Sequence, residues 1–204
     1  MTITQRPSPN HSSRLGRAVT LIVTHHTASR TAEGAIRWLC DPESRVSAHY
    51  VIARDGAVTQ LVPENLSAWH TGPCRWPGDA GPTRSLNRES IGIELVNRGN
   101  GIEKFPIDQL VALSDLMVDI RKQHPETTIV RHRDIAWPRG RKTDPSDLFP
   151  WDGFWKPAEP TVCPTCNGSG VYRQEHDFCT EELGCPHCEG SGKMPASQPP
   201  KETP

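Results

Sequence analysis

Runs of apolar and β-branched residues, separated by polar or turn-forming residues, predict the strands of this chain. The run from Ala18 to His25 indicates a buried strand that ends in a histidine. Two further runs flank Asp55-Gly56, a dipeptide typical of a β-hairpin turn. The predicted strands after the first are His49 to Ala53, Ala57 to Val62, Ser90 to Val96 and Thr128 to Val130.

Apolar residues at helical spacing predict two helices. The clearer one is Pro106 to Gln123, where proline suits the first turn and leucine, methionine and isoleucine recur on one face. A shorter helix is expected within Thr31 to Cys40. Strands interspersed with helices predict an α/β fold, in which a mixed central β-sheet is flanked by helices.

Composition divides the chain into segments. The central part carries all the elements above and is long enough for one catalytic domain. Proline-rich or polar segments without apolar periodicity surround it. The expected organisation is a flexible N-terminal arm (1–16), a catalytic domain (17–155), a linker (156–162), a cysteine module (163–192) and a disordered tail (193–204).

Charge and hydropathy limit the partners. The net charge is −1, with 23 basic and 24 acidic residues, so no global field attracts nucleic acid or an anionic membrane. The most apolar stretch, Ala18 to Val23, is far shorter than the roughly 20 residues of a membrane span. The first residues contain no apolar signal-peptide core. We therefore expect a monomer made in the cytoplasm without a signal peptide, with neither nucleic-acid binding nor membrane insertion.

Polar side chains with hydrolytic chemistry occur in the predicted strands and in the loop after the last one. His25 ends the first strand, and Glu94 lies inside the strand Ser90 to Val96. His132, Lys142 and Asp144 lie in the loop that follows Val130. Two imidazoles and a carboxylate can hold zinc and leave the fourth tetrahedral position to water. A glutamate can move the proton of that water, and a lysine can stabilise the developing oxyanion. A histidine at a strand end is more often structural, so spacing alone leaves both interpretations open.

Five motifs occur in order: IVTHHTAS, VSAHYVIARDGAVTQLV, AWHTG, SIGIELVN and GRKTDPSDLFPW. Together they resemble the type 2 N-acetylmuramoyl-L-alanine amidase family, which includes phage endolysins and recycling amidases and is related to peptidoglycan-recognition proteins. The resemblance covers roughly residues 18 to 155. It implies a catalytic zinc held by His25, His132 and Asp144, with Glu94 as the base and Lys142 as the transition-state partner.

One position departs from part of that family. A phage branch has a catalytic tyrosine where this chain has Ala48, which favours the mechanism that uses glutamate and lysine. Four other polar residues are candidate substrate contacts, each with a structural role as the alternative: His26, His49, His70 and Asn87.

The resemblance implies hydrolysis of the amide bond between N-acetylmuramic acid and L-alanine, with peptidoglycan or a muropeptide as the partner. The leading expectation is a phage or prophage endolysin that acts on the cell wall and lyses the cell. The first alternative is a cytosolic amidase that recycles anhydro-muropeptides. The second is a non-catalytic peptidoglycan-binding module, but such members typically lack a zinc ligand, and this chain has all three.

The C-terminal cysteines form an internal repeat, CPTCNGSG and CPHCEGSG. The spacing C-x2-C-x18-C-x2-C is typical of a structural zinc held by four thiolates, and each half resembles the CxxCxGxG repeat of the DnaJ chaperone zinc domain. We therefore expect a second zinc at Cys163, Cys166, Cys185 and Cys188. An oxidised or disordered tail is the alternative, and His176, Cys179 and His187 are spare ligands.

Overall fold

The computed structural model describes residues 2–75 and 83–151, together with Cys166, Ser169 and four short strands beyond them. The chain divides into two compact units, Met1–Pro150 and Trp151–Pro204. Each unit is described by itself below.

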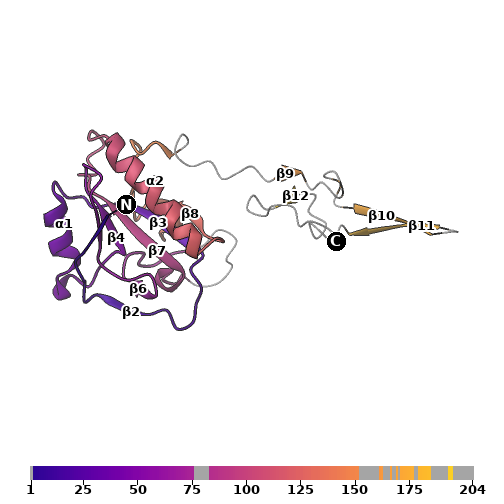
Figure 1. The fold of residues 1–204 in the computed structure, drawn as a ribbon, viewed down its shortest axis with the longest axis horizontal. Helices are drawn as coiled ribbons and strands as arrows, with labels where there is room; N and C mark the ends of the chain where they lie inside the picture. The colour runs from indigo at the N-terminus through magenta and orange to yellow at the C-terminus, as the bar shows by residue number, and fades with distance from the viewer. Residues whose placement is uncertain are drawn as a thin grey trace. The chain divides into compact units, whose positions relative to one another are not determined.

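A six-stranded mixed sheet is the centre of the first unit, in the order β1-β5-β4-β7-β3-β8 (Figure 1). The four adjacent strands β4, β7, β3 and β8 are parallel to one another, whereas β5 runs antiparallel to β4. The predicted mixed sheet is therefore confirmed. The strands are β1 Ile3–Gln5, β3 Leu21–His26, β4 Tyr50–Ile52, β5 Val58–Gln60, β7 Ser90–Leu95 and β8 Thr128–Arg131.

Helices flank this sheet. In the long helix α2 (Ile107–Gln123), Leu113, Met117 and Ile120 of the predicted apolar face are buried, and Leu110 is half-buried. The shorter helix α1 (Ala32–Leu39) begins where the Thr31 side chain accepts a hydrogen bond from the amide of Gly34. The remaining elements are α3 His132–Ile135 and the 3-10 turns η1 Pro42–Ser44 and η2 Asn87–Glu89. No helix in the described part of the chain is both long and apolar enough to span a bilayer.

The N-terminal residues differ from the predicted flexible arm. β1 pairs with the edge strand β5, and β2 (His11–Ser13) pairs with β6 (Leu66–Ala68). The buried Arg14 side chain donates hydrogen bonds to the carbonyls of Glu64 (2.7 Å) and Ser90 (3.0 Å). Backbone pairing and a buried guanidinium hold this segment, and neither produces an apolar period in the sequence.

Two pairs of short strands form the described part of the second unit. β9 (Thr161–Val162) pairs with β12 (Lys193–Met194), and β10 (Val171–His176) pairs with β11 (Cys179–Gly184), both antiparallel. β9 falls within the predicted linker and β12 within the predicted disordered tail, and the other residues of both segments lie outside the described part of the chain. Of the four predicted zinc ligands, Cys166 is buried, and the other three cysteines lie outside the described residues.

Candidate active site

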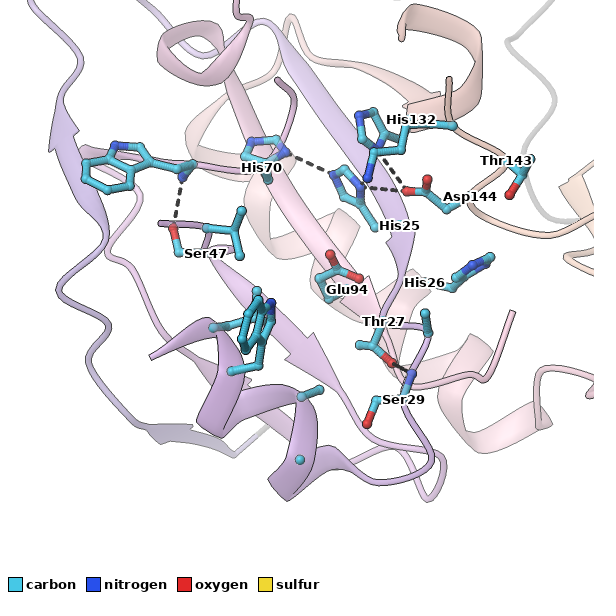
Figure 2. A pocket seen from close by; sticks show the side chains of 18 of the residues that line it. His25, His26, Thr27, Ser29, Ser47, His70, Glu94, His132, Thr143 and Asp144 are labelled. Atoms are coloured by element: carbon cyan, nitrogen blue, oxygen red, sulfur yellow. Dashed lines mark hydrogen bonds and ion pairs between the residues drawn. The ribbon is translucent and has the colours of Figure 1, made fainter. Parts of the chain in front are cut away.

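Three side chains far apart in the sequence meet at one edge of the sheet (Figure 2). Nδ1 of His25 lies 3.0 Å from Nδ1 of His132, and Oδ2 of Asp144 lies 2.9 Å from both nitrogens. All three residues are buried. The structure therefore brings together the zinc ligands expected from the sequence, with one ligand atom of each facing the others.

Strand topology explains why these residues converge. His25 is next to the end of β3, and His132 begins α3 directly after β8, which is parallel to β3. The carboxyl ends of neighbouring parallel strands meet at one sheet edge, a usual place for a site in α/β folds. The loop that carries Asp144 is held there because the amide of Arg133 donates to the carbonyl of Asp144 (2.9 Å).

The protonation of this cluster fits a cation. Nε2 of His132 donates to the carbonyl of Thr71 (2.9 Å), so a neutral His132 presents the lone pair of Nδ1 to the cluster. Burial, and then the neighbouring His132, lower the pKa of His25 to about 4. Although burial raises the pKa of Asp144, the two imidazoles outweigh this and hold it below its usual value. Two imidazole nitrogens and a carboxylate oxygen are zinc ligands, so the residues fit that metal.

Glu94 lies beside this cluster without a partner for one of its oxygens. It is on β7, in register with His25 on β3, and its side chain faces the same hollow (Figure 2). Its Oε2 is buried and has no hydrogen-bond partner within the described ranges. Burial and the Asp144 carboxylate raise the pKa of Glu94 to about 8, and Lys142 opposes that shift. A carboxyl group that titrates near neutral pH suits proton transfer.

A cleft of about 580 Å³ contains the cluster and the two other predicted catalytic residues, Glu94 and Lys142. Lys142 is exposed, two residues before Asp144. A second hollow of about 570 Å³ shares Lys142 and Arg141 with this cleft and adds the side chains of Arg45 and Arg84. Among the described residues no acidic side chain lines the second hollow, and although Arg84 is paired with Glu89, Arg45, Arg141 and Lys142 give the lining a positive charge.

The four candidate substrate contacts have different surroundings. His26 and His70 line the cleft. His26 accepts a hydrogen bond from the amide of Ser146 (3.1 Å), and His70 contacts His25. Asn87 lines the second hollow and holds the turn at His70. His49 lines neither hollow: it is fully buried, and its Nδ1 accepts the amide of Gly92 (2.9 Å), which is a structural role.

Sequence reasoning missed three groups that shape the site. The Thr71 carbonyl orients His132, and the Ser90 hydroxyl contacts His70 (3.0 Å). Arg141 donates to the carbonyls of Thr71 (2.9 Å) and Pro73 (2.8 Å), which ties down the loop between His132 and Asp144. The motifs AWHTG and GRKTDP contained two of these residues, but a contact to a backbone carbonyl leaves no signal in the sequence.

The mixed α/β fold, with two histidines and an aspartate converging in a cleft, defines a candidate metal-dependent hydrolase, and comparison with known proteins gives its family. The model of the family described as N-acetylmuramoyl-L-alanine amidase matches residues 15–147. The chain therefore belongs to the N-acetylmuramoyl-L-alanine amidase family.

Two kinds of named amidase are among the individual relatives. N-acetylmuramoyl-L-alanine amidase AmiD of Escherichia coli K12 is 38% identical over 165 residues, which are 69% of this chain and 56% of AmiD. The 1,6-anhydro-N-acetylmuramyl-L-alanine amidase AmpD of the same strain is 31% identical over 169 residues, 72% of this chain and 87% of AmpD. The chain spans little more than half the length of two of these relatives: 56% of AmiD and 58% of AmpD from Haemophilus influenzae.

Solved structures agree with this assignment. A selenomethionine AmpD derivative has a TM-score of 0.64 and 28% identity, over 74% of this chain and 92% of that one. The complex of Escherichia coli AmiD with anhydro-N-acetylmuramic acid-L-Ala-D-γ-Glu-L-Lys has a TM-score of 0.57 and 34% identity. The match covers 73% of this chain and 59% of that one. A Drosophila peptidoglycan recognition protein shares the fold, with a TM-score of 0.54 and 17% identity. That match covers 72% of this chain and 87% of the other.

Proposed function

We propose that this protein hydrolyses the amide bond between N-acetylmuramic acid and L-alanine in a zinc-dependent reaction, with anhydro-muropeptides as its substrates. The observation that carries the proposal is the buried cluster of His25, His132 and Asp144, with Glu94 beside it in one cleft and its Oε2 without a partner among the described residues. The choice of substrate is supported by AmpD, which is named for the anhydro sugar, and by the AmiD complex with an anhydro-muropeptide.

The side chains have separate roles in this reaction. His25, His132 and Asp144 would hold the zinc, which polarises the attacking water and the scissile carbonyl when it is bound. Glu94 accepts a proton from the attacking water at its carboxylate and returns it to the leaving amine of L-alanine. Lys142 reaches into the cleft from its rim and stabilises the negative charge that develops on the carbonyl oxygen.

The second hollow is the proposed place for the stem peptide. Its cationic side chains Arg45, Arg141 and Lys142 complement the carboxylates of an acidic peptide, such as the one carrying D-γ-Glu in the AmiD complex. It is continuous with the catalytic cleft at Lys142 and Arg141, so a peptide could extend from the scissile bond into it.

Three candidate functions are separated by one assay. Purified protein is incubated with soluble anhydro-muropeptide and with intact sacculi, each with and without a chelator. We expect chelator-sensitive release of L-alanine amino termini from the soluble substrate, which would fit action in the cytoplasm. Turnover of sacculi alone would instead support an endolysin that acts on the cell wall. Binding without turnover of either substrate would leave only a peptidoglycan-binding module.

The role of Glu94 has its own test. Glu94→Gln keeps the size of the side chain but cannot accept a proton, so kcat should fall at least about 100-fold. Zinc content should stay unchanged, because Glu94 is not one of the three converging ligands. Activity that survives the substitution, measured with metal content on the same sample, would remove Glu94 as the base.

We also propose a structural zinc in the second unit, held by its four cysteines. Two strand pairs support it: β9 precedes the first CxxC motif and pairs with β12, and β10 follows that motif and pairs with β11. Each motif therefore occupies an equal stretch of chain, 163–170 and 185–192, between two paired strands. Metal analysis should find two zinc ions per chain and one in Cys166→Ser; two ions in that variant would contradict the proposal.

A further inference from the structure

A row of polar contacts leads away from the metal-ligand cluster into the first unit. Nε2 of His25 lies 3.0 Å from Nδ1 of His70, and Nε2 of His70 lies 3.0 Å from Oγ of Ser90. The Ser90 hydroxyl also lies 2.8 Å from the carbonyl oxygen of Leu86, to which it donates. His70 is partly buried and lines the cleft, and the proposed chemistry assigns its imidazole no role there.

We propose that His70 is a positioning residue that holds the His25 ring in the tautomer whose Nδ1 lone pair faces the metal. The proposal rests on the zinc site proposed above. It assigns His70 no contact with the reacting atoms: His70 acts through His25, and Ser90 acts through His70.

The Leu86 carbonyl at one end of this row determines which atom donates in each hydrogen bond. The Leu86 carbonyl can only accept, so the single Ser90 proton goes to it and Ser90 Oγ accepts from Nε2 of His70. A neutral His70 then has a lone pair on Nδ1, which accepts from Nε2 of His25. The His25 proton is thereby kept away from Nδ1, the atom that faces Asp144 and His132. If each hydrogen bond ran the other way, with His70 donating to Nε2 of His25, a neutral His25 would carry its proton on Nδ1, where the metal needs a lone pair.

This arrangement requires a neutral His70, with its one ring proton on Nε2 facing Ser90. An imidazolium at this position would present N–H groups to both neighbours and could not accept from His25.

The same turn orients the second ligand histidine. The Thr71 carbonyl accepts from Nε2 of His132 (2.9 Å), as His70 does from His25. Asn87 holds this turn, because its Oδ1 accepts the backbone amides of His70 (3.1 Å) and Thr71 (2.9 Å). The two zinc-ligand imidazoles are thus oriented by consecutive residues, one through a side chain and the other through a backbone carbonyl.

Strand β7 leaves room for the His70 ring at one position. A Cβ atom on Gly92 would lie 2.6 Å from Cγ and Nδ1 of His70, closer than such atoms approach in proteins. Gly92 is two residues before Glu94 on this strand. The glycine in the SIGIEL motif therefore allows His70 to pack against the strand that carries the proposed base.

Three substitutions separate orientation from simple packing. His70→Asn keeps an acceptor near the position of Nδ1, His70→Gln places its amide toward Ser90 but offers His25 no acceptor, and His70→Leu offers neither. We expect zinc affinity, measured by competition with a chelating dye, to fall about 10–100-fold in the leucine and glutamine variants. The asparagine variant should stay within about 5-fold of the unsubstituted protein, because its acceptor for His25 remains. The exposed His11→Asn serves as the control and should change nothing.

A measurement on the unsubstituted protein completes the test in case a variant does not fold. In the zinc-loaded protein, the 15N shifts of the His70 ring should be those of the Nε2–H tautomer. An Nδ1–H tautomer, equal losses in the asparagine and glutamine variants, or wild-type affinity in the leucine variant would each overturn the proposal. If the unsubstituted protein itself binds no zinc at this site, the proposed function fails instead, so the two failures are distinguishable.

Discussion

At the scale of single residues, Glu94 combines the chemistry of the site with a cost in stability. Its carboxyl group is buried beside Asp144, and its Oε2 has no hydrogen-bond partner among the described residues. The pKa of Glu94 is raised to about 8, so the folded protein favours the protonated form. In the unfolded chain the same group has its ordinary pKa of about 4.5. Ionised Glu94 therefore destabilises the metal-free fold as pH rises from about 4.5 to about 8.

This linkage predicts a pH-dependent effect of Glu94→Gln in metal-free protein. Glutamine cannot ionise, so the variant should gain stability over the unsubstituted protein as pH rises through that window, and the gain should level off above pH 8. Above pH 8 we expect the Tm to be raised by about 3 °C or more. Thermal unfolding between pH 4 and 9 measures the difference, with the exposed Glu43→Gln as the matched control. A difference that does not change with pH would refute the assigned environment.

At the scale of elements, Arg14 holds the N-terminal segment against the sheet. Besides Glu64 and Ser90, its guanidinium donates to the carbonyl of Arg88 (2.9 Å). Burial lowers the pKa of Arg14 to about 10, against the attraction of Glu64, so the group remains charged at neutral pH. Backbone carbonyls of three different turns and strands thus depend on one side chain, which explains why a segment without apolar periodicity is ordered.

Replacing Arg14 by methionine should therefore be costly. Methionine fills a similar volume but leaves these buried carbonyls without a donor, so the free energy of unfolding should fall by about 2–4 kcal/mol. Urea denaturation measures the loss. Arg17→Met is the matched control, because Arg17 is exposed and its ion pair with Glu89 (3.1 Å) contributes less than about 1 kcal/mol. Equal losses in the two variants would show that the contacts of Arg14 do not order the segment.

The elements also show how far the sequence predicts this molecule. The hairpin β4–β5 could be predicted because its turn signal, Asp55-Gly56, is local in the sequence. Helix α2 could be predicted because its apolar residues repeat over several turns. β1, β2 and β6 have three residues each, too few for a period, and depend on pairing with distant strands. The ligand cluster followed from ordered motifs. The groups that orient it did not, since the Thr71 carbonyl meets His132 only in the folded chain.

At the scale of the whole molecule, the two proposed zinc sites belong to different units. His25, His132 and Asp144 lie within Met1–Pro150, and all four cysteines of the repeat lie within Trp151–Pro204. Each unit has its own strand pairs, and no sheet combines strands of both among the described residues. Because zinc binding stabilises only the fold that contains the site, the two ions should contribute to separate unfolding transitions.

This separation predicts that Asp144→Asn and Cys166→Ser act independently. Asp144→Asn should abolish activity, remove one zinc and lower the Tm of the first unit by about 5 °C or more, with the transition of the second unit unchanged. Cys166→Ser should remove the other zinc and melt the second unit at lower temperature, while kcat stays within about 2-fold, because no cysteine of the repeat lies in the unit that contains the cleft. Calorimetry with metal analysis on the single and double variants checks this. Independent sites give additive losses, and non-additive losses would show that the units are coupled.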